Sequence, residues 1–146
     1  MTTAFIVSAT IDRPAAEVWA RLTDWPAATA WMPGVRSIRV NDDELIFHTR
    51  GRDRTGRVET VEPGRTVVVH SAQGGVSAAY TYTCVPDGGR TTVTLTADCR
   101  VEGVWRPFAG LLRTAIRRTD GGQVAALKRV IEAVSPDGRS SAGSSG

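Results

Sequence analysis

Six strand-like runs in the middle of the chain constrain the fold more than any other feature. The hydrophobic pattern in this part of the chain is typical of strands and not of helices. Short segments rich in Gly, Pro, Asn and Asp separate the runs and favour tight turns between antiparallel strands. The predicted strands cover residues 35–40, 44–50, 53–61, 66–73, 77–85 and 90–102. We therefore expect a single antiparallel sheet built from consecutive hairpins.

Other patterns precede this series. Residues 5–11 alternate like one more strand. Asp12 is predicted to be the N-cap of a helix that has Pro14 in its first turn and ends near Leu22. A second short helix is predicted at residues 26–31. Together with the hairpins, these elements predict an α+β domain.

The apolar spacing becomes helical from Pro107 to Val134. Gly121 and Gly122 interrupt this pattern, so a kink is expected there. Residues 135–146 are rich in Ser and Gly and are predicted to form a disordered tail. The folded domain is therefore predicted to span residues 1–134, a length that suits one domain with its own core.

Composition and charge argue against several classes of function. The net charge of +3 is mild, and the basic stretch at residues 50–57 contains an acidic residue and alternates like a solvated hairpin. No nucleic-acid partner is therefore expected. No apolar run approaches the ~18 residues that a membrane span requires, and residues 1–4 show no secretory signal. We predict a cytoplasmic protein without stable membrane insertion.

Both cysteines are predicted to be free thiols. A two-residue turn at Gly88 and Gly89 would pair Cys84 with Val93, which lies six residues before Cys99. That separation corresponds to ~20 Å along a strand, whereas a disulfide needs Cα atoms within about 7 Å. The same distance excludes a zinc site built on the two cysteines, and the two histidines are scattered as well. No metal and no other cofactor is predicted.

Two-residue turns also determine which side chains share a face of the sheet. Five predicted turns lie at residues 42–43, 51–52, 63–64, 74–75 and 88–89. They agree on one apolar face, on which the predicted pairs are Ile38 with Phe47, Val40 with Leu45, Phe47 with Gly56, Leu45 with Val58, Thr49 with Arg54, Thr60 with Val67, Val58 with Val69, Val69 with Tyr80, Val67 with Tyr82, Ser71 with Ala78, Tyr82 with Leu95, and Tyr80 with Ala97. His48 and His70 fall on the opposite face, so both are predicted to be surface residues.

A segment rich in tryptophan and proline lies between the first strand and the hairpins. It begins with Arg13-Pro14-Ala15-Ala16-Glu17-Val18-Trp19 and continues with Asp24-Trp25-Pro26-Ala27-Ala28-Thr29-Ala30-Trp31-Met32-Pro33-Gly34-Val35. In this position the segment resembles the opening of the START-like (SRPBCC) superfamily. Within it, the resemblance is to the polyketide cyclase/dehydrase and lipid-transport-like branch, and it covers about residues 4–134.

The resemblance implies a helix-grip fold. In this fold a curved antiparallel sheet, here of about seven strands, wraps around a long C-terminal helix, and two short helices follow the first strand. A cavity for a hydrophobic small molecule would open where the turns at 51–52 and 74–75 lie. The side chains predicted to contact this molecule are Trp31, Met32, Phe47, Thr49, Val69, Ser71, Cys99, Trp105, Phe108 and Leu112. Trp19 and Trp25 are expected in the core, and core packing is the alternative for every aromatic residue.

Three polar side chains are candidates for chemistry in this cavity. Arg54 faces inward by parity, where its cation could hold a carboxylate or polarise a carbonyl. The hydroxyl of Tyr80 or Tyr82 could donate to the same oxygen or act as a weak acid. The alternatives are an Arg54 side chain that reaches solvent and tyrosine hydroxyls bonded to backbone or water.

Motifs for other chemistries are missing from the sequence: it has no nucleophile elbow, no phosphate loop and no dinucleotide-binding glycine motif. Any catalysis would therefore depend on orienting a reactive substrate. The first hypothesis is binding of a polyketide-, lipid- or isoprenoid-like molecule, with cyclisation or dehydration of a polyketide-like chain if the protein is an enzyme. The alternatives are a non-catalytic lipid carrier or sensor, and a protein-interaction module similar to START-like toxins and chaperone activators. A monomer or dimer is expected.

Overall fold

Seven antiparallel strands form one sheet with the order β1-β7-β6-β5-β4-β3-β2. The computed structural model describes residues 2–32, 35–49, 51–73, 76–101, 107, 110–111, 114, 117–118 and 122–133. Within them the strands are β1 (Thr2–Ile11), β2 (Val35–Asn41), β3 (Glu44–Thr49), β4 (Arg52–Glu62), β5 (Thr66–Gln73), β6 (Val76–Asp87) and β7 (Arg90–Val101). The helical elements with defined bounds are α1 (Ala15–Leu22), the 3-10 helix η1 (Trp25–Ala30) and α3 (Gln123–Glu132).

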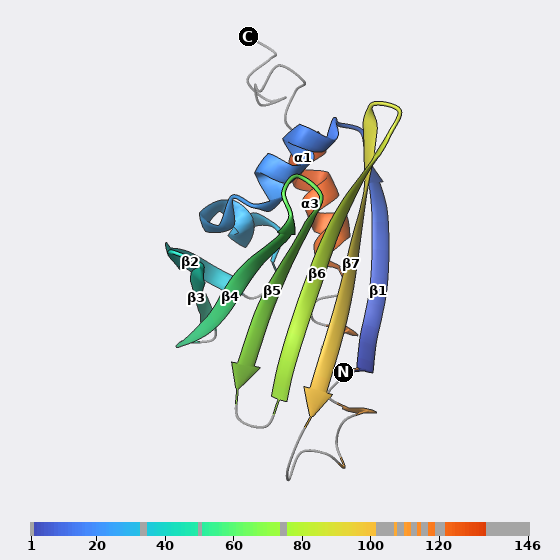
Figure 1. Cartoon of the computed structure of the whole chain (residues 1–146). Helices are drawn as coiled ribbons and strands as arrows, with labels where there is room; N and C mark the ends of the chain where they lie inside the picture. The colour runs from blue at the N-terminus through green and yellow to red at the C-terminus, as the bar shows by residue number, and fades with distance from the viewer. Residues whose placement is uncertain are drawn as a thin grey trace.

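The sheet is curved, and its helices lie on the concave side. Figure 1 shows α1 and α3 behind β5, β6 and β7, while the β2–β3 hairpin turns away from the plane of these strands. The 3-10 helix η1 packs against β2 and so closes the curved end of the sheet. This arrangement confirms the predicted α+β architecture, with a curved sheet of seven strands and a helix from the C-terminal part of the chain.

Most of the predicted hairpin registers are confirmed. Ile38 pairs with Phe47 across β2 and β3. The predicted register also holds between β4 and β5, between β5 and β6, and between β6 and β7, where Tyr82 lies opposite Leu95. The first strand, β1, pairs with β7. The apolar face predicted from turn chemistry is therefore the concave face of the sheet.

The predicted register between β3 and β4 is wrong by two residues. Phe47 lies opposite Arg54, not Gly56, and Leu45 lies opposite Gly56, not Val58. Thr49 pairs with Arg52 instead of Arg54, so the chain reverses before Arg52; Gly51 within this reversal has a φ of +75°, a left-handed conformation that glycine accepts without strain. A shift of two residues keeps every side chain on its predicted face.

Asp12 is not the N-cap of α1. The helix begins at Ala15 with Pro14 in the capping position and no side-chain cap. The backbone N–H of Asp12 instead donates to the Glu132 carboxylate at 2.9 Å, and the Asp12 carboxylate lies 3.5 Å from Nε of Arg90. Asp12 thus connects the end of β1 to the C-terminal helix and to β7.

The second short helix is present, but as a 3-10 helix. The N–H of Ala27 donates to the Asp24 carbonyl at 3.0 Å, and Pro26 occupies the first turn. Short 3-10 turns suit connectors of this kind. Because η1 is short, Trp25 and Trp31 stand at its two ends and reach the same part of the core.

The C-terminal helix is described in part. Positions 110–111, 114 and 117–118 are helical, and α3 begins at Gln123 directly after Gly122. The other glycine of the predicted kink, Gly121, and the predicted tail at residues 135–146 lie outside the described residues. None of the helical segments that the structure describes has the length and apolar composition to span a bilayer.

The apolar face of α3 packs against the concave face of the sheet. Val124, Leu127 and Ile131 are each at most 2% exposed. At the other end of this helix, Nζ of Lys128 lies 2.7 Å from the Glu132 carboxylate and donates to the Thr10 carbonyl at 2.6 Å. These contacts, together with the Asp12–Glu132 hydrogen bond, anchor the end of α3 to the end of β1.

Candidate functional site

The concave face of the sheet has two halves that differ in burial. We call the half nearer the β4–β5 and β6–β7 turns the upper inner face; Val67, Tyr82 and Leu95 are each at most 1% exposed there. The other half, nearer the β3–β4 turn, is the lower inner face. Phe47, Ser71 and Tyr80 are only partly buried there, although Val69, Ala97 and Cys99 beside them are buried.

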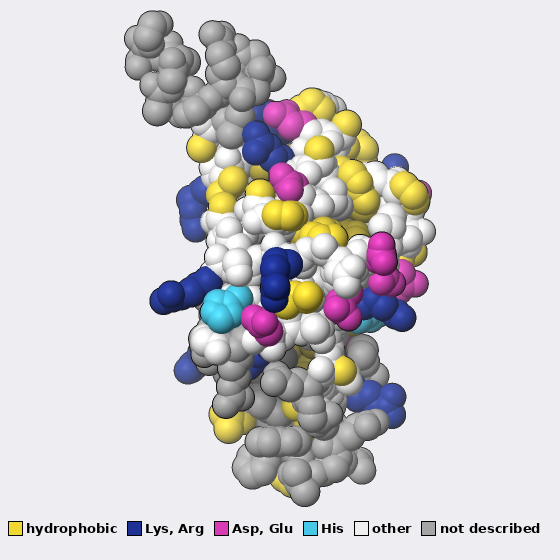
Figure 2. Space-filling view, turned by 90° about the vertical axis from the view of Figure 1, so that its left-hand side faces the viewer, with side chains coloured by type: hydrophobic (Ala, Val, Ile, Leu, Met, Phe, Trp, Pro, Cys, Tyr) yellow, Lys and Arg dark blue, Asp and Glu magenta, His cyan; other side chains and the backbone are white. Residues whose placement is uncertain are grey.

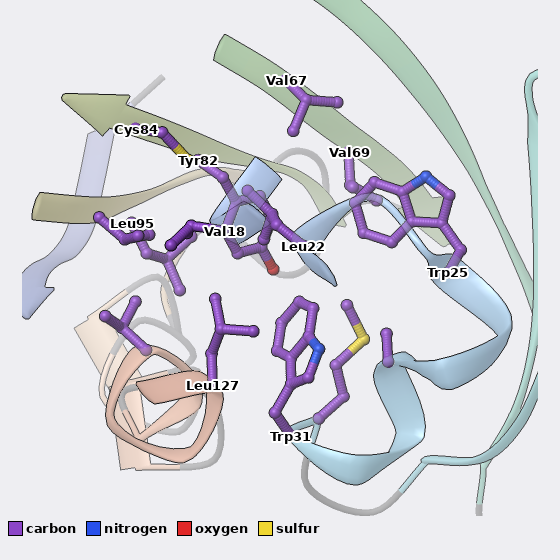
Figure 3. Packing of buried hydrophobic residues seen from close by; sticks show 14 of the residues in the cluster. Val18, Leu22, Trp25, Trp31, Val67, Val69, Tyr82, Cys84, Leu95 and Leu127 are labelled. Carbon is purple, nitrogen blue, oxygen red and sulfur yellow. The ribbon is translucent and has the colours of Figure 1, made fainter. Parts of the chain in front are cut away.

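Tyr82 lies at the centre of the upper inner face. Its hydroxyl donates to Oε1 of Gln123 at 2.6 Å. The rings of Trp25 and Trp31 approach it edge-on, with centroids 6.4 Å and 5.9 Å from the Tyr82 ring (Figure 3). The hydroxyl is thus held inside the core by a side chain of α3, and a catalytic role for Tyr82 stays a prediction.

Gln123 was missed by the reasoning from sequence. It is 5% exposed and is one of two buried polar residues of the described core. A signal was present, because Gln123, Leu127 and Ile131 follow one another at the four-residue spacing of a helix face. A polar residue on an apolar helix face needs a buried partner, but the sequence does not say which residue supplies it.

Tyr80 and Ser71 lie on the lower inner face with Phe47. Tyr80 pairs with Val69 and Ala97 across the neighbouring strands, and Ser71 pairs with Ala78. Phe47 packs over Gly56: a Cβ built on Gly56 would lie 3.0 Å from Cε2 of this ring. Tyr80 and Ser71 are therefore partly buried polar residues on this part of the concave face.

The remaining predicted site residues do not all join this group. Arg54 has an exposed side chain near the β3–β4 turn, as in the alternative in which it reaches solvent. For Thr49 only the backbone is described, at the end of β3. Three further predicted contacts lie outside the described residues; they are Trp105, Phe108 and Leu112.

The cysteines and histidines are where the sequence placed them. Cys84 and Cys99 are buried and not joined in a disulfide, and burial raises the pKa of the Cys84 thiol to about 11, which keeps it protonated near neutral pH. Nδ1 of His48 lies 2.9 Å from the Asp53 carboxylate, and Nε2 of His70 lies 2.9 Å from the Glu59 carboxylate. Histidine side chains are visible at the surface in Figure 2.

Trp31 and Met32 line a pocket on the other side of this core. The pocket has a volume of about 390 Å³ and lies between η1 and the C-terminal helical segments. Its lining residues are Thr29, Ala30, Trp31, Met32, Arg118, Gly122, Ala126 and Arg129. Trp31 and Met32 are 3% and 7% exposed, so they form a firmly packed apolar wall. Trp25, which is 6% exposed, packs in the core as predicted.

The described residues therefore separate the predicted contacts into two groups. Trp31 and Met32 belong to the pocket beside η1, whereas Phe47, Ser71 and Tyr80 belong to the lower inner face. Trp31 reaches Tyr82, which the sequence analysis placed deep in the cavity, instead of standing at a rim. Two arginines that the sequence analysis did not single out, Arg118 and Arg129, line the pocket.

Similar folds occur among solved structures. The Zhui aromatase/cyclase from Streptomyces sp. R1128 is 17% identical, with a TM-score of 0.68 over 88% of this chain and 92% of that one. A START superfamily protein from Mycobacterium smegmatis is 17% identical, with a TM-score of 0.66 over 88% of this chain and 96% of that one. The di-domain ARO/CYC BexL from the BE-7585A biosynthetic pathway is 18% identical, with a TM-score of 0.76 over 91% of this chain; the chain spans 47% of that protein.

At these identities the similarities show a shared fold, which confirms the predicted START-like architecture. A search of curated proteins gives no significant match. Residues 2–132 match the family described as polyketide cyclase/dehydrase and lipid transport. That match covers the sheet, η1 and α3, and thus both groups of predicted contacts. The chain belongs to the polyketide cyclase/dehydrase and lipid transport family.

Proposed function

We propose that the protein binds a hydrophobic small molecule of polyketide, lipid or isoprenoid type, and that this molecule contacts Trp31 and Met32. The observation that carries the proposal is the pocket of about 390 Å³ with an indole and a thioether in its wall. Its volume falls within the range of roughly 300–1,000 Å³ typical of small-molecule sites. Family membership supports the same class of ligand.

The pocket has a wall suited to an apolar ligand. Trp31 is supported from behind by the Tyr82 ring, and its N-terminal neighbour Ala30 is exposed. Ala126 on α3 contributes a small, partly buried side chain to the lining. Small side chains over a rigid aromatic wall leave room for a ligand without a cost in reorganising the core.

A test uses two alanines of η1. Replacement Ala30→Trp places a large ring in the pocket, whereas Ala27→Trp adds the same ring at an exposed position of η1 that does not line it. With the neutral dye Nile red as the probe, we expect Ala30→Trp to weaken binding about tenfold or more and Ala27→Trp to leave it unchanged. Equal affinities for wild type and both variants would contradict the proposed binding site.

Cyclisation or dehydration of a polyketide-like chain is the second candidate function. It is favoured by the partly buried Tyr80 hydroxyl on the lower inner face. In an aldol closure, water takes a proton from an acidic methylene between two carbonyls, the enolate carbon bonds to a ketone carbon as its C=O π bond breaks, and the new alkoxide takes a proton back from the hydronium. Tyr80 would donate a hydrogen bond to the alkoxide oxygen, and the exposed Arg54 would hold a carboxylate of the same chain. The aromatase/cyclases among the similar structures suggest this chemistry without assigning it to this protein.

Tyr80→Phe separates catalysis from binding. We expect this variant to keep Nile red affinity and to lose turnover of a poly-β-keto substrate by about tenfold or more. Native mass spectrometry of the wild-type protein purified from its own host would identify any ligand that it carries. A wild-type protein that binds the substrate without converting it would exclude the catalytic function and leave the carrier or sensor function.

A further inference from the structure

We propose that the ligand of the pocket beside η1 is amphipathic and carries an oxyanion, a carboxylate or a phosphate, that Arg118 and Arg129 bind. The inference rests on the proposed function, because it adds a charged end to a ligand whose apolar part lies against Trp31 and Met32. The feature that points to it is the charge of the described part of the lining, which includes two arginines and neither Asp nor Glu.

The two arginines come from neighbouring helical segments. Arg129 lies on α3, where Gly122, Ala126 and Arg129 follow one another at the spacing of a single helix face. Arg118 belongs to the helical positions before Gly122. Both side chains are exposed, so they reach the pocket from its solvent side, whereas the apolar wall is buried.

Both guanidinium groups are available to a ligand. The ion pairs found among the described residues do not include either arginine. The carboxylate closest in sequence to Arg129, that of Glu132, is bound by Lys128 and by the backbone N–H of Asp12. Two cations on one pocket repel each other, and an anionic ligand would relieve that repulsion.

The chemistry of the site fits an oxyanion better than a neutral polar group. A guanidinium donates two parallel hydrogen bonds to a carboxylate or a phosphate, and such charge-assisted bonds are among the stronger ones. Thr29 belongs to the same lining, and a threonine hydroxyl is able to donate a further hydrogen bond. Because the arginines are exposed, the attraction should weaken as salt is added.

The experiment compares ligands that share one chain and differ in their end group. Titration calorimetry with laurate, dodecyl phosphate and dodecanol is carried out on the wild type and on Arg118→Gln, Arg129→Gln and Arg117→Gln. Arg117 is exposed and helical and does not line the pocket, so its variant removes one positive charge without touching the site. Thermal unfolding checks that each variant is folded.

We expect the wild type to bind laurate or dodecyl phosphate about tenfold more tightly than dodecanol. Arg118→Gln and Arg129→Gln should each remove most of that preference by weakening the binding of the charged ligands much more than that of dodecanol, while Arg117→Gln should leave the preference as it is in the wild type. Raising NaCl from about 50 to 300 mM should weaken binding of the charged ligands only. The stronger of the two charged ligands identifies the oxyanion.

Two results would overturn the inference. Equal binding of laurate and dodecanol, unaffected by the arginine variants, would remove the anion site and leave the proposed apolar binding intact. Inorganic phosphate and acetate are titrated as ligands without a chain; if either binds as tightly as the long-chain ligands, the site binds anions without an apolar partner. Failure of all three long-chain ligands, with no effect of Ala30→Trp on Nile red, would instead contradict the proposed function.

Discussion

The upper inner face and the pocket beside η1 both include Trp31, but they differ in burial and in charge. On the upper inner face, Trp31 meets the ring of Tyr82 inside a core whose members are almost completely buried. On the pocket side, the same residue lines a space of about 390 Å³ together with two exposed arginines. Trp31 therefore packs against the core on one side and lines the pocket on the other.

This difference indicates that folding stability and ligand affinity can be changed at different residues of the protein. A buried core residue is held by contacts on all sides, so its truncation costs several kcal/mol. Ala30, Arg118 and Arg129 are exposed, and changes at such positions usually alter stability by less than about 0.5 kcal/mol. Variants of the core should therefore change unfolding, and variants of the pocket should change ligand affinity.

The largest effect on stability is expected at Tyr82. Tyr82→Ala removes a ring that contacts Trp25 and Trp31, together with the hydroxyl that donates to Gln123, so the free energy of unfolding should fall by about 3–5 kcal/mol. Urea unfolding measures this change. Tyr80→Ala, on the same strand and the same face but only partly buried, is the matched control and should lose less. Equal losses would remove the contrast between the two halves of the face.

Gly56 should show a smaller but clear effect. A Cβ at this position would lie 3.0 Å from Cε2 of Phe47 and 3.1 Å from the His70 carbonyl oxygen, and the backbone atom cannot move aside cheaply. Gly56→Ala should therefore lower the free energy of unfolding by about 1–3 kcal/mol.

A double mutant locates the cause of that loss. Phe47→Leu removes the ring, so in this background Gly56→Ala should cost less than in the wild type. If the two changes are additive, the loss comes from the backbone contact with His70 and not from the aromatic ring. Either result shows which contact limits the size of the side chain that the lower inner face accepts at position 56.

The smallest effect is expected at the C-terminal end of α3. Hydrogen bonds from Lys128 and from the Asp12 backbone lower the pKa of Glu132. A lowered pKa in the folded state means that the charged form stabilises the protein above the ordinary glutamate pKa of about 4.3, and that this contribution is lost as the pH falls through the folded-state value.

Glu132→Gln tests this linkage. The variant should be less stable than the wild type by about 1 kcal/mol or less at pH 7, and the difference should shrink toward zero as the pH is lowered below the glutamate range. Thermal unfolding as a function of pH measures both quantities. Nile red affinity should stay unchanged, because Glu132 does not line the pocket. A stability difference that is constant with pH would show that charge is not the cause.

The hairpins show how accurately turn residues predict the register between neighbouring strands. Four of the five predicted registers are confirmed, and these positioned Tyr80, Tyr82 and Ser71 on one face of the sheet. The β3–β4 register was off by two residues because a single glycine, Gly51, suits either position of a two-residue turn. Because side chains of a strand alternate between its two faces, a shift of two residues left each side chain on its predicted face and changed only the cross-strand partners between β3 and β4.

Sequence alone determined the strands, the apolar face that they share and the separation of Cys84 from Cys99 that prevents a disulfide, because turns and periodicity act over a few neighbouring residues. Only the tertiary structure decided that the Tyr82 hydroxyl binds Gln123, 41 positions away in the chain, and that Arg118 and Arg129 share a pocket with Trp31 and Met32. Such contacts depend on how the C-terminal helical segments dock against η1 and the sheet. No local pattern encodes the distance between side chains on elements that meet only after folding.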